Sequence, residues 1–313
     1  MSTKMEIQFN KEGKPYIMWG DNVIQLESDP VTDKRYKEKA EQELRETPEI
    51  VAEAIEELRK LLRGETGLVI PIDRDDFLMK FLRPCKFYAE SAFKRIQAYY
   101  KFRLAHPDQC YDLTSTSVRA AFDHSIVSIL SPRDQHGRRM MLVESGARWN
   151  PRDVSLTEVF RGVQLGLEAA MVEPLTQVNG VVSILDMKGL TFAQIMQFTP
   201  SFAKMIVDWI QDCVPIRLKA VHIINQPYIF NMLFAIFKPF LREKLRSRIH
   251  FHGSSKQSLL SHVDASALRI RHGGTLPDPE IPGDLLWQML HHYEEDFKVA
   301  NSYGYVSNNN KTK

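Results

Sequence analysis

Residues 178–190 read VNGVVSILDMKGL, and residues 218–225 read LKAVHIIN. Both segments contain runs of apolar, largely β-branched side chains without polar alternation, which is typical of strands covered on both faces. Shorter β-rich runs lie at 125–130, 140–144 and 248–251, and helical patterns separate most of the runs, at 156–172, 192–213 and 227–245. This order predicts an α/β domain with a mostly parallel sheet, because strands that alternate with helices form parallel pairs. Asp134-Gln135-His136-Gly137 predicts a hairpin turn between the first two strands.

The N-terminal third has the pattern of amphipathic helices. Thr47-Pro48-Glu49 starts one helix, and apolar residues then recur at spacings of three and four through Leu62. Two more helices are expected at 75–82 and 89–104. We therefore divide the chain into an N-terminal arm (1–30), which is compatible with short strands or an ordered arm, a helical domain (31–107), the α/β domain (108–280), a helical extension (281–305) and a disordered tail (306–313).

Composition excludes several classes of protein. With 43% hydrophobic and 26% charged residues, the chain has the mix of a globular protein rather than a disordered or collagen-like one. A net charge of +2 gives no general attraction to nucleic acid, and three separated cysteines argue against a disulfide scaffold. The first residues lack the apolar segment of a signal peptide, and no run of about 20 apolar residues occurs. These features predict a cytosolic protein.

The sequence contains none of the common catalytic motifs. G-x-S-x-G, the phosphate-binding glycine loops and H-E-x-x-H are all missing. His250 and His252 share one strand face, but no third ligand is nearby, so we predict hydrogen-bonding histidines and no metal. Ser183, Asp186 and His222 lie on neighbouring strands without an exposed turn for the serine, which indicates buried polar residues rather than a catalytic triad. We expect no enzyme activity.

Two neighbouring features are unusual. Residues 228–241 read YIFNMLFAIFKPFL, which is either a fully buried helix or a helix that covers an apolar cavity and can move onto a membrane. The segment between residues 215 and 250 contains seven basic residues and one acidic residue, which gives it a local net charge of +6. These basic residues are either simply solvated or form a site for anionic lipid headgroups; their position beside the apolar segment makes nucleic acid the weaker partner.

Five segments resemble the CRAL-TRIO lipid-transfer family. They are DDFLMKFLRPCKFYAESAFKRIQAYYKFR (75–103), VNGVVSILDMKGL (178–190), VPIRLKAVHIINQPYIFNMLFAIFKPFLREKL (214–245), RIHFHG (248–253) and HGGTLP (272–277). The likeness runs in order from about residue 49 to residue 290. It is greatest to the branch that contains alpha-tocopherol transfer protein, cellular retinaldehyde-binding protein and the clavesins.

The resemblance implies that residues 108–280 form a lipid-binding domain with a deep apolar pocket closed by a mobile gate helix. The gate would be Asn225–Phe240, with five residues facing ligand or bilayer: Ile229, Phe230, Leu233, Phe234 and Phe237. By the same resemblance, a phosphoinositide headgroup would bind Arg83, Arg217, Lys219, Lys244 and Arg248. The pocket would be lined by Glu144, Phe160, Val163, Leu167, Leu185, Ile206, Trp209, Ile210 and Val221.

The ligand class stays open. Val163, Leu167 and Glu144 stand where the tocopherol carrier has two hydroxyl side chains and a tyrosine, and a few placed polar groups usually set selectivity. Tocopherol, a retinoid, a carotenoid, another prenyl lipid and a phospholipid are the candidates. We expect a monomeric carrier without a cofactor, loaded with a hydrophobic ligand that it exchanges at phosphoinositide-containing membranes. The alternative is an interaction module with a filled pocket that transfers nothing.

Overall fold

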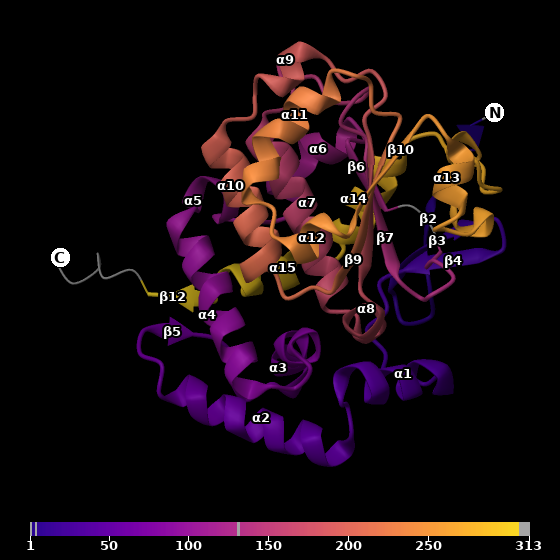
Figure 1. Cartoon of the computed structure of the whole chain (residues 1–313). Helices are drawn as coiled ribbons and strands as arrows, with labels where there is room; N and C mark the ends of the chain where they lie inside the picture. Colours follow the sequence, from indigo (N-terminus) through magenta and orange to yellow (C-terminus); the bar gives the residue numbers. More distant parts are fainter. Residues whose placement is uncertain (1, 4, 130–131, 307–313) are drawn as a thin grey trace.

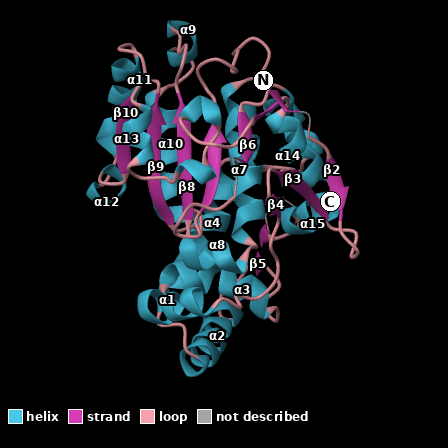
Figure 2. Cartoon of the chain, turned by 90° about the vertical axis from the view of Figure 1, so that its right-hand side faces the viewer, coloured by secondary structure: helices cyan, strands magenta, loops and turns pink. Residues whose placement is uncertain are grey.

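The computed structural model describes residues 2–3, 5–129 and 132–306. Its central sheet has five strands in the order β10-β9-β8-β7-β6, and only β6 runs antiparallel to its neighbour (Figure 2). The strands are β6 (Val127–Ile129), β7 (Arg139–Val143), β8 (Val181–Asp186), β9 (Leu218–Ile224) and β10 (Ile249–Gly253). The prediction of an α/β fold with a mostly parallel sheet is confirmed.

Helices cover both faces of this sheet, which explains why its central strands are apolar on both sides. Leu142 of β7 and Ile184 of β8 face a cluster with Leu259 of α13, while Val143 and Leu185 face the opposite side. Figure 1 shows α7, α10 and α11 on that opposite side. The helices concerned are α7 (Leu156–Met171), α9 (Phe192–Ile195), α10 (Pro200–Asp208), α11 (Phe230–Phe237), α12 (Glu243–Arg246) and α13 (Lys256–Leu260).

Two long helices expected from the sequence are broken. The segment 192–213 contains α9, α10 and a final π-helical turn (Trp209–Cys213), because Thr199 and Pro200 start a new helix. The expected gate helix begins at Phe230 rather than Asn225, and Lys238–Phe240 is a 3-10 turn. Proline is the physical reason at these points, since Pro227 and Pro239 lack the N–H that a continuous helix needs.

The N-terminal helices pack as expected from their apolar stripes. The Thr47 side chain accepts a hydrogen bond from the Ile50 N–H at 3.3 Å, so the predicted helix start is confirmed. Their core continues into the α/β part, since Leu58 and Phe81 belong to the same apolar cluster as Phe160. The elements are α1 (Lys34–Leu44), α2 (Pro48–Arg63), α3 (Asp75–Leu82), α4 (Ala89–Ala105), α5 (Pro107–Cys110), α6 (Arg119–Asp123) and α8 (Pro174–Asn179).

The two ends of the chain add small sheets to this body. Strands β2 (Ile7–Phe9), β3 (Pro15–Trp19) and β4 (Asn22–Gln25) form an antiparallel sheet that contacts α14 (Figure 1). The remaining elements are β1 (Ser2–Thr3), which pairs with β11 (Asp278–Pro279), then α14 (Pro282–His291), α15 (Glu294–Asn301) and β12 (Gly304–Tyr305), which pairs with β5 (Leu68–Val69). Of the expected disordered tail, all but Val306 lies outside the described residues.

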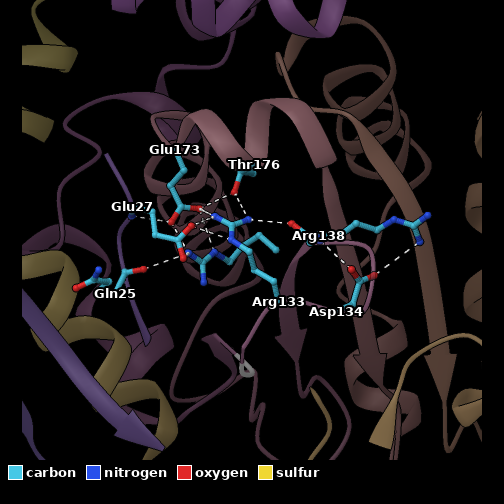
Figure 3. A network of polar contacts seen from close by, with 9 residues as sticks. Gln25, Glu27, Arg133, Asp134, Arg138, Glu173 and Thr176 are labelled. Carbon is cyan, nitrogen blue, oxygen red and sulfur yellow. Dashed lines mark hydrogen bonds and ion pairs between the residues drawn. The ribbon is translucent and has the colours of Figure 1, made fainter. Parts of the chain in front are cut away.

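A buried carboxylate holds the N-terminal arm against the sheet. Glu173 has no solvent exposure, and it accepts hydrogen bonds from Arg139, from Arg133 at 3.2 Å and from the Thr176 hydroxyl at 2.6 Å (Figure 3). It also accepts the backbone N–H of Glu27 at 3.1 Å. Because a buried charge is costly unless paired, this network fixes the arm beside the domain that carries the cavity.

Candidate functional site

An apolar cavity of about 270 Å³ lies between one face of the sheet and α7, α10 and α11. Among its lining residues, only Ser145, Ser183 and the indole N–H of Trp209 offer polar side-chain groups. A surface of this composition holds a ligand by removing apolar area from water, at about 25 cal/mol per Å². None of the described residues that line it carries a charge that would bind a charged ligand.

Most pocket residues expected from the resemblance line this cavity. From the sheet, α7, α10 and the π-helical turn come Phe160, Val163, Leu167, Leu185, Ile206, Trp209, Ile210 and Val221. Four of the five gate residues line it too, namely Phe230, Leu233, Phe234 and Phe237. Ile229 is the exception. It precedes the first turn of α11 and packs in the cluster around Phe230 instead of facing the cavity.

The expectation that Glu144 lines the pocket is wrong. Met141 and Val143 of β7 face the cavity, so the alternation of side chains turns Glu144 to the other side of the sheet. There its carboxylate binds Arg271 at 2.6 Å, Arg148 at 3.1 Å and the fully buried Arg269 at 3.5 Å. Burial lowers the pKa of Arg269 to about 10, and the charge of Glu144 opposes that shift. Glu144 therefore neutralises the buried Arg269 and two partly exposed arginines, on the side of the sheet away from the cavity.

The sequence reasoning missed lining residues that strand alternation would have found. Ser183 lies two residues before Leu185 on β8, and Ile223 lies two residues after Val221 on β9. Side chains two positions apart share a face, so each predicted strand residue implies its partners. Ile216 and Ile249 also line the cavity. Ser183 matters most of these, because its hydroxyl is one of the few groups that can bind a polar end of a ligand.

Helix α11 separates the cavity from the surface and is apolar on both sides. Its inner residues line the cavity, while Tyr228 just before it and Met232 on it are 91% and 51% exposed. Phe192 and Met196, in and after α9, are 53% and 63% exposed, and Ile195 of α9 packs with Phe230. Figure 1 shows α9 at the same end of the molecule as α11. We call these four exposed residues the apolar face. Exposed apolar side chains grouped beside a cavity mark a surface that meets a partner or a membrane.

Two of the expected headgroup residues share one carboxylate. Arg217 and Lys219 at the start of β9 both contact Oε2 of Glu43 in α1, at 2.5 Å and 3.3 Å. Burial lowers the pKa of Lys219, and the neighbouring charge of Arg217 lowers it further. Arg217 also donates to the backbone oxygen of Val178 in α8. These contacts bring helix α1, helix α8 and strand β9 together around positive charge.

The other three expected headgroup residues differ in their partners and in their exposure. Arg83 pairs with Glu46 at 2.7 Å and donates to Gln177 of α8 at 2.6 Å. Gln177 is next to Val178, the residue of α8 that Arg217 contacts. Arg248 donates to the Leu218 backbone oxygen, and burial together with the charge of Arg217 lowers its pKa. Lys244 is exposed on α12, and within the described part of the chain it pairs with neither of the carboxylates, Glu43 and Glu46, that bind the other residues. We call Arg83, Arg217, Lys219 and Arg248 the basic site.

The histidines lie on the sheet face away from the cavity. His222 Nδ1 and His252 Nε2 are 2.9 Å apart, and the rings of His250 and His262 lie within 5.2 Å of that of His222. No group of three or more metal-ligating side chains in residues 2–3, 5–129 and 132–306 is arranged to hold a metal ion. No triad forms either, because Ser183 lines the cavity while the Asp186 carboxylate binds His272 at 3.2 Å.

Acidification should destabilise the protein through this histidine cluster. Burial and the neighbouring His252 lower the pKa of His222 to about 3, and burial lowers that of His250 and His252. When the pKa of a histidine is lower in the folded state, the free energy of unfolding keeps its full value above pH ~6.5, where the ring is neutral in both states. Below that pH the free energy of unfolding falls, by up to about 1.4 kcal/mol per pH unit for each histidine. Carboxylates whose pKa is lowered contribute to the pH dependence of stability only below about pH 4.5. We therefore expect urea unfolding to show falling stability between about pH 6.5 and 5.

The variant His222→Gln should flatten that slope, because it removes one titrating ring. His124→Gln, at an exposed histidine, is the matched control and should leave the slope unchanged. Equal slopes in wild type and His222→Gln would contradict the assignment.

No helix among the described residues is long and apolar enough to cross a membrane. Comparison with known proteins gives a consistent relationship. The family model described as "CRAL/TRIO domain" matches residues 123–274. Clavesin-1 of Mus musculus is 31% identical over 274 residues, covering 87% of this chain and 76% of that protein. "Alpha-tocopherol transfer protein-like" of Mus musculus is 35% identical over 237 residues, covering 76% of this chain and 69% of that protein.

The crystal structure of Sfh5 is a more distant match, with a TM-score of 0.45 and 14% identity over 83% of this chain and 98% of that one. Identity above 30% across most of both chains shows a common family, and the residues that line the cavity lie inside the region that the family model matches. The chain belongs to the CRAL-TRIO family, the lipid-binding and lipid-transfer proteins that its sequence resembles.

Proposed function

We propose that the protein is a non-enzymatic cytosolic carrier, which holds a small hydrophobic ligand in the cavity and exchanges it at membranes that contain phosphoinositides. The observation that carries the proposal is the position of α11. Its inner residues Phe230, Leu233 and Phe234 close an apolar cavity, and the apolar face lies on the outside. Helix α11 thus has the apolar cavity on one side and exposed apolar side chains on the other.

The size and lining of the cavity narrow the ligand class. A volume of about 270 Å³ lies below the range of about 300–1,000 Å³ that is usual for ligand pockets. This favours a compact neutral lipid, such as an isoprenoid or retinoid, over a phospholipid with two acyl chains. The hydroxyls of Ser145 and Ser183 can bind one alcohol or carbonyl group. Nothing in the lining neutralises a phosphate, so a charged headgroup belongs outside this cavity.

Release needs a second apolar phase, since the buried ligand gains nothing from entering water. In the proposed exchange, the apolar face docks on the bilayer, α11 moves outward and the ligand passes into the lipid. The basic site binds the phosphoinositide headgroup at the same membrane. If headgroup binding favours the open position of α11, then the open position must favour headgroup binding by the same factor.

Organic extraction and mass spectrometry of the protein purified from animal cells test the proposal. We expect one neutral hydrophobic compound in a stoichiometric amount. A folded sample that yields no lipid, and takes up none from a mixed lipid extract, would contradict carriage and favour an interaction module.

A further inference from the structure

Helix α1 supplies carboxylates to the basic site. Glu43 contacts Arg217 and Lys219 with one oxygen, and Glu46 binds Arg83 through both of its oxygens at 2.7 to 3.0 Å. Two negative charges therefore already stand among the four positive charges of the basic site, and Lys39 of α1 adds another positive charge near Glu43 and Lys219. Burial opposes ionisation of Glu43, yet the hydrogen bond from Arg217 and the charge of Lys219 hold its pKa below the usual range. Glu43 is thus ionised at neutral pH, where the basic site is also charged.

The two carboxylates differ in how easily they can leave. The side chains of Glu46 and Arg83 are only 16% and 13% exposed, and their contact is bidentate, which is the strong geometry for such a pair. Glu43 is 40% exposed and meets its partners with one oxygen, so it can rotate into water while α1 stays in place. Arg217, at 13% exposure, stays fixed by its bond to Val178. Glu43 is therefore the group that an incoming anion would replace.

We infer that Glu43 is an internal competitor in the basic site, which sets the minimum charge that a headgroup needs to bind: polyphosphorylated headgroups exceed it, and lipids with a single negative charge do not. The inference rests on the proposed function. A ligand gains only the difference between its own attraction and that of the carboxylate it replaces. A monoanionic lipid brings the same charge as Glu43 and gains little. A bisphosphorylated inositol brings several charges and more acceptor oxygens, which the arginine forks of the site can bind together.

Glu43→Gln tests this with little risk to folding, because glutamine has the same shape and keeps an oxygen for Arg217 while removing the charge. Glu41→Gln is the matched control. It lies on the same helix, is exposed, and makes no ion pair or side-chain hydrogen bond within the described residues. The readout is the affinity for two sets of phosphatidylcholine vesicles of equal total surface charge, one with phosphatidylserine and one with phosphatidylinositol bisphosphate.

We expect Glu43→Gln to raise the affinity for both sets of vesicles by on the order of tenfold, because every ligand of the site replaces the same carboxylate, so that the phosphatidylserine vesicles also bind measurably. Glu41→Gln should behave as wild type. If wild type prefers the phosphoinositide and Glu43→Gln binds neither set of vesicles more tightly than wild type does, this inference is wrong while the proposed function stands. If wild type shows no preference at all, both are wrong.

Soluble inositol trisphosphate separates the headgroup from the bilayer. It should displace wild type from phosphoinositide vesicles, because the phosphates rather than the acyl chains fill the basic site. A Glu43→Gln effect that appears with vesicles while inositol trisphosphate competes with neither protein would place the effect at the bilayer contact and overturn the assignment.

Discussion

Replacing both Tyr228 and Met232 with aspartate should slow ligand transfer to vesicles by about tenfold or more, while binding of the ligand in solution stays nearly unchanged. Both side chains are more than half exposed and neither lines the cavity, so the substitutions leave the packing of α11 intact. An aspartate at the centre of a bilayer costs about 2.5–3.5 kcal/mol and less near the interface. Two such charges on the apolar face therefore oppose its entry into the membrane.

The measurement is the rate at which a fluorescent retinoid or tocopherol analogue moves from the loaded protein to acceptor vesicles. Tyr111→Asp combined with Val172→Asp is the matched control, since both residues are exposed and lie away from α9 and α11. The control should transfer at the wild-type rate. Equal rates for all three proteins would show that the apolar face does not enter the membrane.

The sheet was predictable because its central strands have no polar face. Val181–Leu185 and Ala220–Ile224 are apolar on both sides, and burial on both faces leaves few architectures other than a helix-covered parallel sheet. The helix breaks at Pro200, Pro227 and Pro239 could also have been predicted from the sequence. They were missed because apolar periodicity continues across each proline, while the missing N–H interrupts the hydrogen bonds.

The cavity and the partners of the basic site were harder to predict. Lining residues such as Leu167 and Val221 have the composition of any core, so periodicity cannot tell a filled core from an empty one. Their assignment came from the resemblance, which failed at Glu144, where strand alternation gives the right answer. The contact of Glu43 with Arg217 joins residues 174 positions apart. Helix α1 mixes basic and acidic residues, and nothing in its sequence distinguishes Glu43 from Glu38 or Glu41 until the fold places Glu43 beside β9.

Neutralising Arg217 and Lys219 together should abolish the advantage of phosphoinositide vesicles over neutral ones in the transfer assay. Each basic residue near an anionic surface contributes about 1 kcal/mol, so Arg217→Gln with Lys219→Gln should weaken that binding by roughly thirtyfold. Glutamine is preferred to glutamate here, because a new acid beside Glu43 would add repulsion between carboxylates. Ligand binding in solution should persist, since neither side chain lines the cavity.

The control is Arg152→Glu with Lys60→Glu, a larger change in net charge at two exposed residues away from the basic site. If total charge alone drives docking, the control should lose more than the test variant; if the basic site recognises a headgroup, only the test variant should lose the phosphoinositide preference. Added salt should weaken the wild-type preference, because exposed charges are screened within about 8 Å at physiological ionic strength. Should the double glutamine variant still deliver ligand faster to phosphoinositide vesicles, the basic site has no part in exchange, and carriage would depend on the cavity and α11 alone.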